Sequence, residues 1–198
     1  MNPNTLPVRL VSNVVPGFGR GSKELGIPTA NLCKEKLQCK ISFDELPCGI
    51  YWGFARIVDT NTSSDDNNND NSENKKSDEN TSLSPNIKNQ VYKTAVSIGF
   101  NPVYKNKEKT IEPHLIASSN DPLRIASKCK ETQLQDLYGY GIRLSIVGYL
   151  RPELPFEGLD KLIEAIKNDI VQAETLAGNL EDSGTLDELK WVESDHDC

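Results

Sequence analysis

The strongest constraint on the fold is a series of segments whose side chains alternate along the chain. In residues 91–100, the side chains of Tyr92, Val96 and Ile98 fall on one face of an extended backbone. Such period-2 patterning, bounded by Gly and Pro, predicts β-strands. Most of these segments follow one another with no helix between them, which favours an antiparallel barrel or sandwich. The predicted strands are Val8–Val15, Gly49–Val58, Val91–Phe100, Thr110–Ile116 and Ile142–Leu150.

One helix is predicted near the C-terminus, from Leu159 to Leu180. Its apolar residues recur at spacings of three and four, which form a single stripe along a helix. Pro152 and Pro155 precede it, and Gly178 suits its C-terminal end. We expect this helix to close one end or side of the barrel.

A low-complexity stretch separates two of the predicted strands. Between residues 61 and 86 the chain is rich in Asn and Ser, has no aromatic residue and has Leu83 as its only large aliphatic residue. Such a sequence buries too little apolar surface to offset the entropy of ordering it. We therefore expect residues 61–90 to be a disordered insert, which a fold tolerates because loop-closure costs grow slowly with length.

The C-terminal residues 181–198 are strongly acidic. Seven carboxylates lie there against the single cation Lys190, and Trp191 and Val192 are the obvious apolar residues. We expect a solvated acidic tail whose one apolar patch can dock locally.

Charge and cysteine content exclude several classes of function. The formal net charge is −7, which argues against non-specific nucleic-acid binding and against an anionic membrane surface as partner. No apolar run approaches the ~18 residues of a spanning helix, and the N-terminus lacks the pattern of a secretory signal. None of the five cysteines forms a CxxC pair, which predicts reduced thiols. A zinc site on them fails because the only histidines are His114 and His196.

The segment from Gly17 to Asn31 carries the clearest chemical signal. Gly17 begins a run of alternating glycines, and glycine lets backbone amides approach an anion closely. Lys23 follows and supplies charge for phosphate oxygens. Thr29 and Asn31 are two residues apart, so in an extended chain both face the same side. Their hydroxyl and amide oxygens suit Mg²⁺, which predicts a phosphate- and metal-binding loop.

This loop does not match three common phosphate motifs. It has no Gly-Lys-Ser/Thr, as a Walker A loop requires, and its glycines do not have the GxGxxG spacing of a dinucleotide fold. No HRD or DFG motif follows it, which excludes a protein kinase. The glycines alone would fit a flexible turn as well as a phosphate site.

The stretch VVPGFGRGSKELGIPTANL resembles the signature of eukaryotic-type riboflavin kinases. The similarity continues at four later motifs, in the order of that family, and covers roughly residues 8–60 and 91–177. These motifs are Gly49–Gly53, Val96–Pro102, Ile111–Leu115 and Ile146–Glu153.

The resemblance implies a mainly β fold, a six-stranded antiparallel Greek-key barrel with a C-terminal helix. Residues 1–180 would form the kinase domain, ahead of the acidic tail 181–198. The implied reaction is ATP-dependent phosphorylation of the ribityl 5′-hydroxyl of riboflavin, giving FMN and ADP. The implied metal is Mg²⁺, with Zn²⁺ or another divalent ion as the alternative. A monomer in the cytoplasm is expected, with association with mitochondria left open.

The resemblance also implies roles for individual residues, with Glu112 as the catalytic base. Without it, a single Glu in a strand is more often a solvated residue. Arg151 could likewise form a surface ion pair or stack on a flavin ring, and His114 is a structural or supporting candidate. The residues implied to contact ATP are Gly17, Lys23, Thr29, Leu115, Ala117 and Tyr138. The implied metal ligands are Thr29 and Asn31, and the implied flavin contacts are Arg151, Leu154 and Phe156.

Two other functions fit the sequence less well. A flavin- or nucleotide-binding module without catalysis would be expected to lack Thr29, Asn31 or Glu112, and all three are present. A bifunctional enzyme that also adenylates FMN needs a paired-histidine motif and a longer chain. We therefore predict no FAD synthesis.

Overall fold

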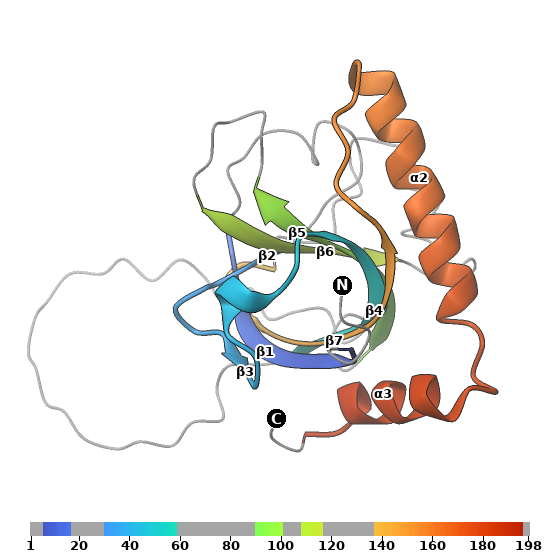
Figure 1. Ribbon diagram of the computed structural model, residues 1–198. Helices are drawn as coiled ribbons and strands as arrows, with labels where there is room; N and C mark the ends of the chain where they lie inside the picture. Colours follow the sequence, from blue (N-terminus) through green and yellow to red (C-terminus); the bar gives the residue numbers. More distant parts are fainter. Residues whose placement is uncertain (1–5, 17–29, 59–89, 101–107, 117–136, 196–198) are drawn as a thin grey trace, which may run out of the picture.

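The computed structural model describes residues 6–16, 30–58, 90–100, 108–116 and 137–195 (Figure 1). Within them the chain forms an antiparallel sheet whose strand order is β2-β1-β7-β4-β5-β6, with β3 also paired to β1. A backbone hydrogen bond of 2.9 Å from Ala30 N–H to the Pro113 carbonyl joins the start of β2 to β6, so the sheet curls into a nearly closed barrel. The strands are β1 (Val8–Val15), β2 (Asn31–Leu32), β3 (Gln38–Cys39), β4 (Gly49–Val58), β5 (Val91–Phe100), β6 (Lys109–Ile116) and β7 (Gly141–Arg151).

The barrel interior is filled by alternate side chains of the strands, as the period-2 pattern predicts. Leu10 on β1, Ile57 on β4 and Leu144 on β7 have no exposed surface. Burial at this level stabilises the fold by about 2 kcal/mol for each such side chain. The mainly β barrel predicted from the sequence is confirmed.

Strand β7 pairs with both β1 and β4, and its pairing with β4 is irregular. The register shifts between Trp52 and Gly53, where the two backbones come very close. A Cβ atom added at Gly53 would lie 1.9 Å from the Ser145 carbonyl oxygen, so no side chain fits there. The irregularity bends the sheet toward closure.

Helix α2 (Leu159–Leu176) packs on the outside of the barrel, against β5 and β4 (Figure 1). The sequence predicted this helix to continue to Leu180, but it ends four residues earlier. Ala177 N–H still bonds to the Ala173 carbonyl, and the next amides then form shorter turns, Gly178 N–H to Thr175 and Asn179 N–H to Leu176. Glycine at this position favours such an end to the helix.

A second helix, α3 (Ser183–Glu193), lies where a solvated tail was expected. Asp182 caps it, since its carboxylate accepts hydrogen bonds from the backbone N–H and the hydroxyl of Thr185, both at 2.8 Å. The apolar patch of this segment does dock, because Trp191 and Val192 are buried against the barrel. The acidic segment 181–198 therefore contains an ordered helix.

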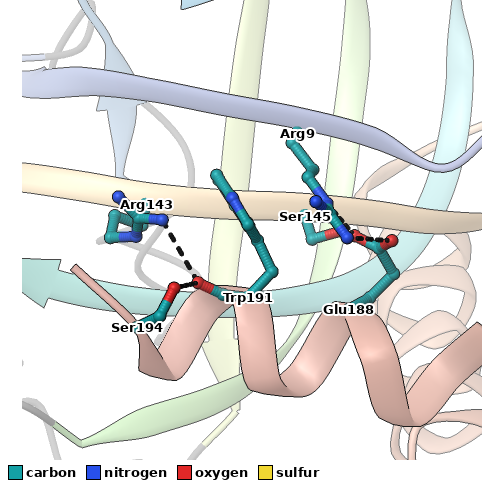
Figure 2. Close-up of polar contacts among 6 residues, drawn as sticks. All are labelled: Arg9, Arg143, Ser145, Glu188, Trp191 and Ser194. Atoms are coloured by element: carbon teal, nitrogen blue, oxygen red, sulfur yellow. Dashed lines mark hydrogen bonds and ion pairs between the residues drawn. The ribbon is translucent and has the colours of Figure 1, made fainter. Parts of the chain in front are cut away.

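Polar contacts fix α3 to strands β1 and β7 (Figure 2). Glu188 is buried and accepts two hydrogen bonds from Arg9, at 2.9 and 3.0 Å, and one from Ser145 at 2.6 Å. The Trp191 ring lies between two guanidinium groups, 5.2 Å from that of Arg9 and 4.3 Å from that of Arg143. A buried carboxylate without partners would be strongly destabilising. Glu188 has all these partners when α3 is docked on the barrel, so these contacts favour the docked position.

Three short elements were not predicted from the sequence: β2, β3 and the 3₁₀ turn η2 (Phe43–Glu45). None is long enough to show a periodic pattern. Among the described residues, Cys33, Cys39 and Cys48 carry free thiols, and the reduced state of the cysteines stays a prediction. In the described part of the chain, helices α2 and α3 both lack the apolar length that crossing a bilayer would require. The predicted insert at residues 61–90 lies, except for its last residue, outside the described residues.

Candidate active site

Glu112 lies on β6 and points away from the barrel interior. Its neighbours Ile111 and Leu115 are in the core, and Glu112 faces the opposite side, half-buried. Its Oε1 accepts a hydrogen bond of 2.9 Å from the hydroxyl of Thr110. A carboxylate oriented in this way retains acceptor positions for a further hydroxyl.

The end of the predicted metal-binding loop lies directly beside this strand. Ala30 donates its N–H to the carbonyl of Pro113, the residue after Glu112, at 2.9 Å. Asn31 follows Ala30 and pairs with Val15 in the β1–β2 ladder. One hydrogen bond thus connects the strand of the predicted base to the backbone between the two predicted metal ligands, Thr29 and Asn31.

Arg151 is held in one orientation by a residue that the sequence analysis missed. Asp169 on α2 is buried and accepts two hydrogen bonds from the guanidinium group, at 2.7 and 2.6 Å. The same guanidinium lies 5.6 Å from the centre of the Phe156 ring. Arg151 therefore forms an ion pair, with a buried carboxylate, and its predicted contact with a flavin ring stays a prediction. Asp169 could have been noticed as an acid within the apolar stripe of the helix.

The residues after β7 form an extended connection to α2 that carries the predicted flavin contacts. Leu154 is 52 % exposed, so its side chain is available for a ligand. Phe156 is half-buried beside Arg151. Apolar and aromatic surface next to a fixed guanidinium suits a planar heterocycle.

Glu153 belongs to the same connection and is a second carboxylate close to Glu112. Burial of its carboxyl raises the pKa of Glu153, and the negative charge of Glu112 raises it further. A backbone N–H from Phe100 and the Arg151 guanidinium act in the opposite direction and lower that pKa. Glu153 is the last residue of the motif Ile146–Glu153, and no role was predicted for it. Two nearby carboxylates with different environments are typical of functional sites.

The residues predicted for the nucleotide side are only partly described. Leu115 is 4 % exposed in the barrel core, so a nucleotide would have to contact its backbone. Tyr138 is 43 % exposed in a turn, and its neighbour Gly139 donates its N–H to the Val14 carbonyl at 2.8 Å. This places Tyr138 near the end of β1, where the predicted phosphate loop begins. Gly17, Lys23, Thr29 and Ala117 lie outside the described residues, and the roles given to all six stay predictions.

The donors available near Glu112 fit a hard divalent cation better than a soft one. Asn31 offers an amide oxygen, and oxygen is the donor atom that Mg²⁺ prefers. Among the described residues, no three His, Cys, Asp or Glu side chains are grouped to hold a metal by themselves. Mg²⁺ commonly takes few protein ligands together with phosphate oxygens and water, so a site completed by a nucleotide is compatible with this arrangement.

A carboxylate beside a backbone segment predicted to bind metal, together with an aromatic–guanidinium surface, suits a phosphotransferase that acts on an alcohol. The profile of one such family, described as "Flavokinase: Riboflavin kinase", matches residues 4–177. The chain belongs to the riboflavin kinase family and is an enzyme. Helix α3 lies beyond the matched stretch.

Curated relatives agree with this assignment. A riboflavin kinase of Aspergillus fumigatus is 39 % identical over 166 residues, covering 82 % of this chain and 72 % of the relative. A riboflavin kinase of Mus musculus is 37 % identical over 174 residues, covering 86 % and 81 %. A crystal structure of riboflavin kinase from Trypanosoma brucei aligns with 87 % of this chain and 78 % of its own, at 19 % identity and a TM-score of 0.48.

Proposed function

We propose that this enzyme transfers the γ-phosphoryl group of ATP to the ribityl 5′-hydroxyl of riboflavin, with Glu112 as the catalytic base. The new bond joins the 5′-oxygen to the γ-phosphorus, the bond to the β-phosphate oxygen breaks, and the products are FMN and ADP. The carboxylate of Glu112 accepts the proton of the hydroxyl as it attacks. The observation that supports this most is the hydrogen bond between Ala30 and Pro113, which joins the predicted metal ligands to the strand of the base.

The remaining roles follow from what each group can bind. Thr29 and Asn31 would hold Mg²⁺, which neutralises charge on the phosphate oxygens when it is bound. The glycines from Gly17 onward and Lys23 would cover the phosphates. The connection after β7 would hold the flavin, with Leu154 and Phe156 as apolar contacts and Arg151 as a planar cation fixed by Asp169.

The direct test is to incubate the purified protein with riboflavin, ATP and Mg²⁺ and to separate the flavins by chromatography. We expect FMN to accumulate with ATP and divalent metal, and to stop accumulating when the metal is chelated. Parallel reactions with Zn²⁺ would decide between the two candidate ions. A protein that binds riboflavin but forms no FMN under any of these conditions would refute the proposal.

We also propose that the enzyme stops at FMN. Incubation of the protein with FMN, ATP and Mg²⁺ should give no FAD. Appearance of FAD in proportion to the protein added would contradict this part of the proposal and leave riboflavin phosphorylation unaffected.

A further inference from the structure

The side chain of Glu153 rests on the backbone of a neighbouring strand. Its carboxyl group lies against Gly99 of β5, where an added Cβ atom would be 1.9 Å from Oε1, 2.1 Å from Cδ and 2.2 Å from Oε2. The backbone N–H of Phe100 donates a hydrogen bond to the same carboxylate. The carboxyl group therefore fills the space that any side chain at position 99 would need.

The register of β5 and β6 places this contact close to Glu112. Gly99 pairs with Thr110, and Ser97 pairs with Glu112. Paired residues of neighbouring strands project to the same face, so the carboxyl of Glu153 shares a face with Glu112. Diagonal positions such as 99 and 112 are about 7–8 Å apart. The hydroxyl of Thr110 lies between them, 2.9 Å from Glu112 Oε1 and 3.3 Å from the Gly99 carbonyl.

Glu153 also has a fixed relation to the predicted flavin contacts, because it lies among them. Arg151 comes two residues before it and is fastened to α2 through Asp169. Leu154 follows it directly and is exposed. The connection is thus attached at two points, to α2 by Arg151 and to β5 by Glu153.

We propose that Glu153 is a positioning residue, which fixes the flavin-binding residues 151–156 on β5 beside the catalytic base. Its anchoring sets the distance between the bound flavin and Glu112, and hence where the 5′-hydroxyl lies. This inference rests on the proposed function, since it takes riboflavin as the acceptor and Glu112 as the base. Glu153 acts through its hold on the connection and does not itself transfer the proton.

The test compares Glu153→Ala with Glu153→Gln in steady-state kinetics. We expect Glu153→Ala to raise KM for riboflavin about tenfold and to change KM for ATP by less than about twofold. Glu153→Gln should restore KM for riboflavin, because its amide oxygen still accepts the N–H of Phe100. Matched controls are Glu157→Ala and Glu157→Gln, since the Glu157 side chain is 85 % exposed and pairs with Lys161 on the surface. Both controls should behave like the wild type.

Two further variants keep the test decisive if Glu153→Ala unfolds. Glu153→Asp retains the charge but is one methylene shorter, so it should reproduce the riboflavin-specific loss. Gly99→Ala leaves Glu153 intact and displaces its carboxyl, with the same expected effect. The inference is wrong if these variants keep the wild-type KM for riboflavin, if KM for ATP rises equally, or if Glu153→Gln is as impaired as Glu153→Ala. Absence of FMN formation by the wild type would instead refute the proposed function.

Discussion

Two arginines on strands of the barrel are each held by a carboxylate on a helix, and their surroundings differ. Arg9 binds both carboxylate oxygens of Glu188 on α3, and the Ser145 hydroxyl also donates to Oε2 of that carboxylate. The buried ring of Trp191 covers this contact. Arg151 binds Asp169 of α2, next to the exposed Leu154 and the half-buried Phe156. The chemistry of the two pairs is the same. The two pairs differ in their surroundings: the Arg9–Glu188 pair docks a helix under a buried ring, whereas the Arg151–Asp169 pair lies beside the proposed flavin contacts.

The largest expected effect on stability is at the α3 contact. Trp191→Ala should lower the free energy of unfolding by about 3–5 kcal/mol, because it removes a large buried side chain that is packed between two guanidinium groups. Trp191→Phe should cost much less, since the indole N–H has no hydrogen-bond acceptor among the described residues. Urea unfolding followed by circular dichroism measures both values. Equal stability of Trp191→Ala and the wild type would show that α3 does not dock as described.

The two helix carboxylates provide the sharpest test of the comparison. Glu188→Gln should lower the free energy of unfolding by about 2 kcal/mol, because a neutral amide weakens a buried charged contact, and it should leave KM for riboflavin unchanged. Asp169→Asn should raise KM for riboflavin by about tenfold, since Arg151 loses its fixed orientation. Kinetics on both substrates and urea unfolding are needed for each variant. If both variants affect riboflavin KM alike, the distinction between the two contacts fails.

The smallest expected effect is on stability, at Asp182, which caps the N-terminus of α3. Hydrogen bonds from the backbone N–H and hydroxyl of Thr185 lower the pKa of Asp182 below its ordinary value of 3.8. A lowered pKa means that the ionised cap stabilises the fold above this value, and that the contribution is lost as the pH falls through the folded-state pKa. Asp182→Ala should therefore lower the melting temperature slightly at pH 7. The difference from the wild type should shrink below about pH 4. A difference that stays constant down to pH 2 would contradict this cause.

The strands could be predicted because burial inside a barrel imposes period 2 on the sequence. The bounds of β1, β4 and β5 agree with the predicted segments, and β6 and β7 extend those segments by one residue or two. Helix α3 was missed because residues 181–198, which contain it, carry seven carboxylates, and this charge obscured the few apolar side chains that the helix buries. Strands β2 and β3 contain two residues each, too few for any pattern.

The candidate site could be predicted where its residues lie in continuous sequence motifs. It could not be predicted where folding brings together residues that are distant in the sequence. Glu112 and Arg151 lie in local motifs that the sequence displays directly. The partner of Arg151 is Asp169, 18 positions away on a helix, and their contact depends on how α2 docks. The contact of Glu153 with Gly99 depends likewise on the path of the chain after β7. No local pattern encodes either pairing. The predicted monomeric state, cytoplasmic location and domain limits stay predictions.

The most direct test of the account is the rate of FMN formation by Glu112→Gln, measured under saturating riboflavin, ATP and Mg²⁺. Glutamine preserves the shape of the side chain and can still bond to Thr110, but it cannot accept the proton of the 5′-hydroxyl. We expect kcat to fall at least about 100-fold, with riboflavin binding retained, while Glu157→Gln keeps the wild-type rate. An undiminished kcat for Glu112→Gln would contradict the assignment of Glu112 as the base.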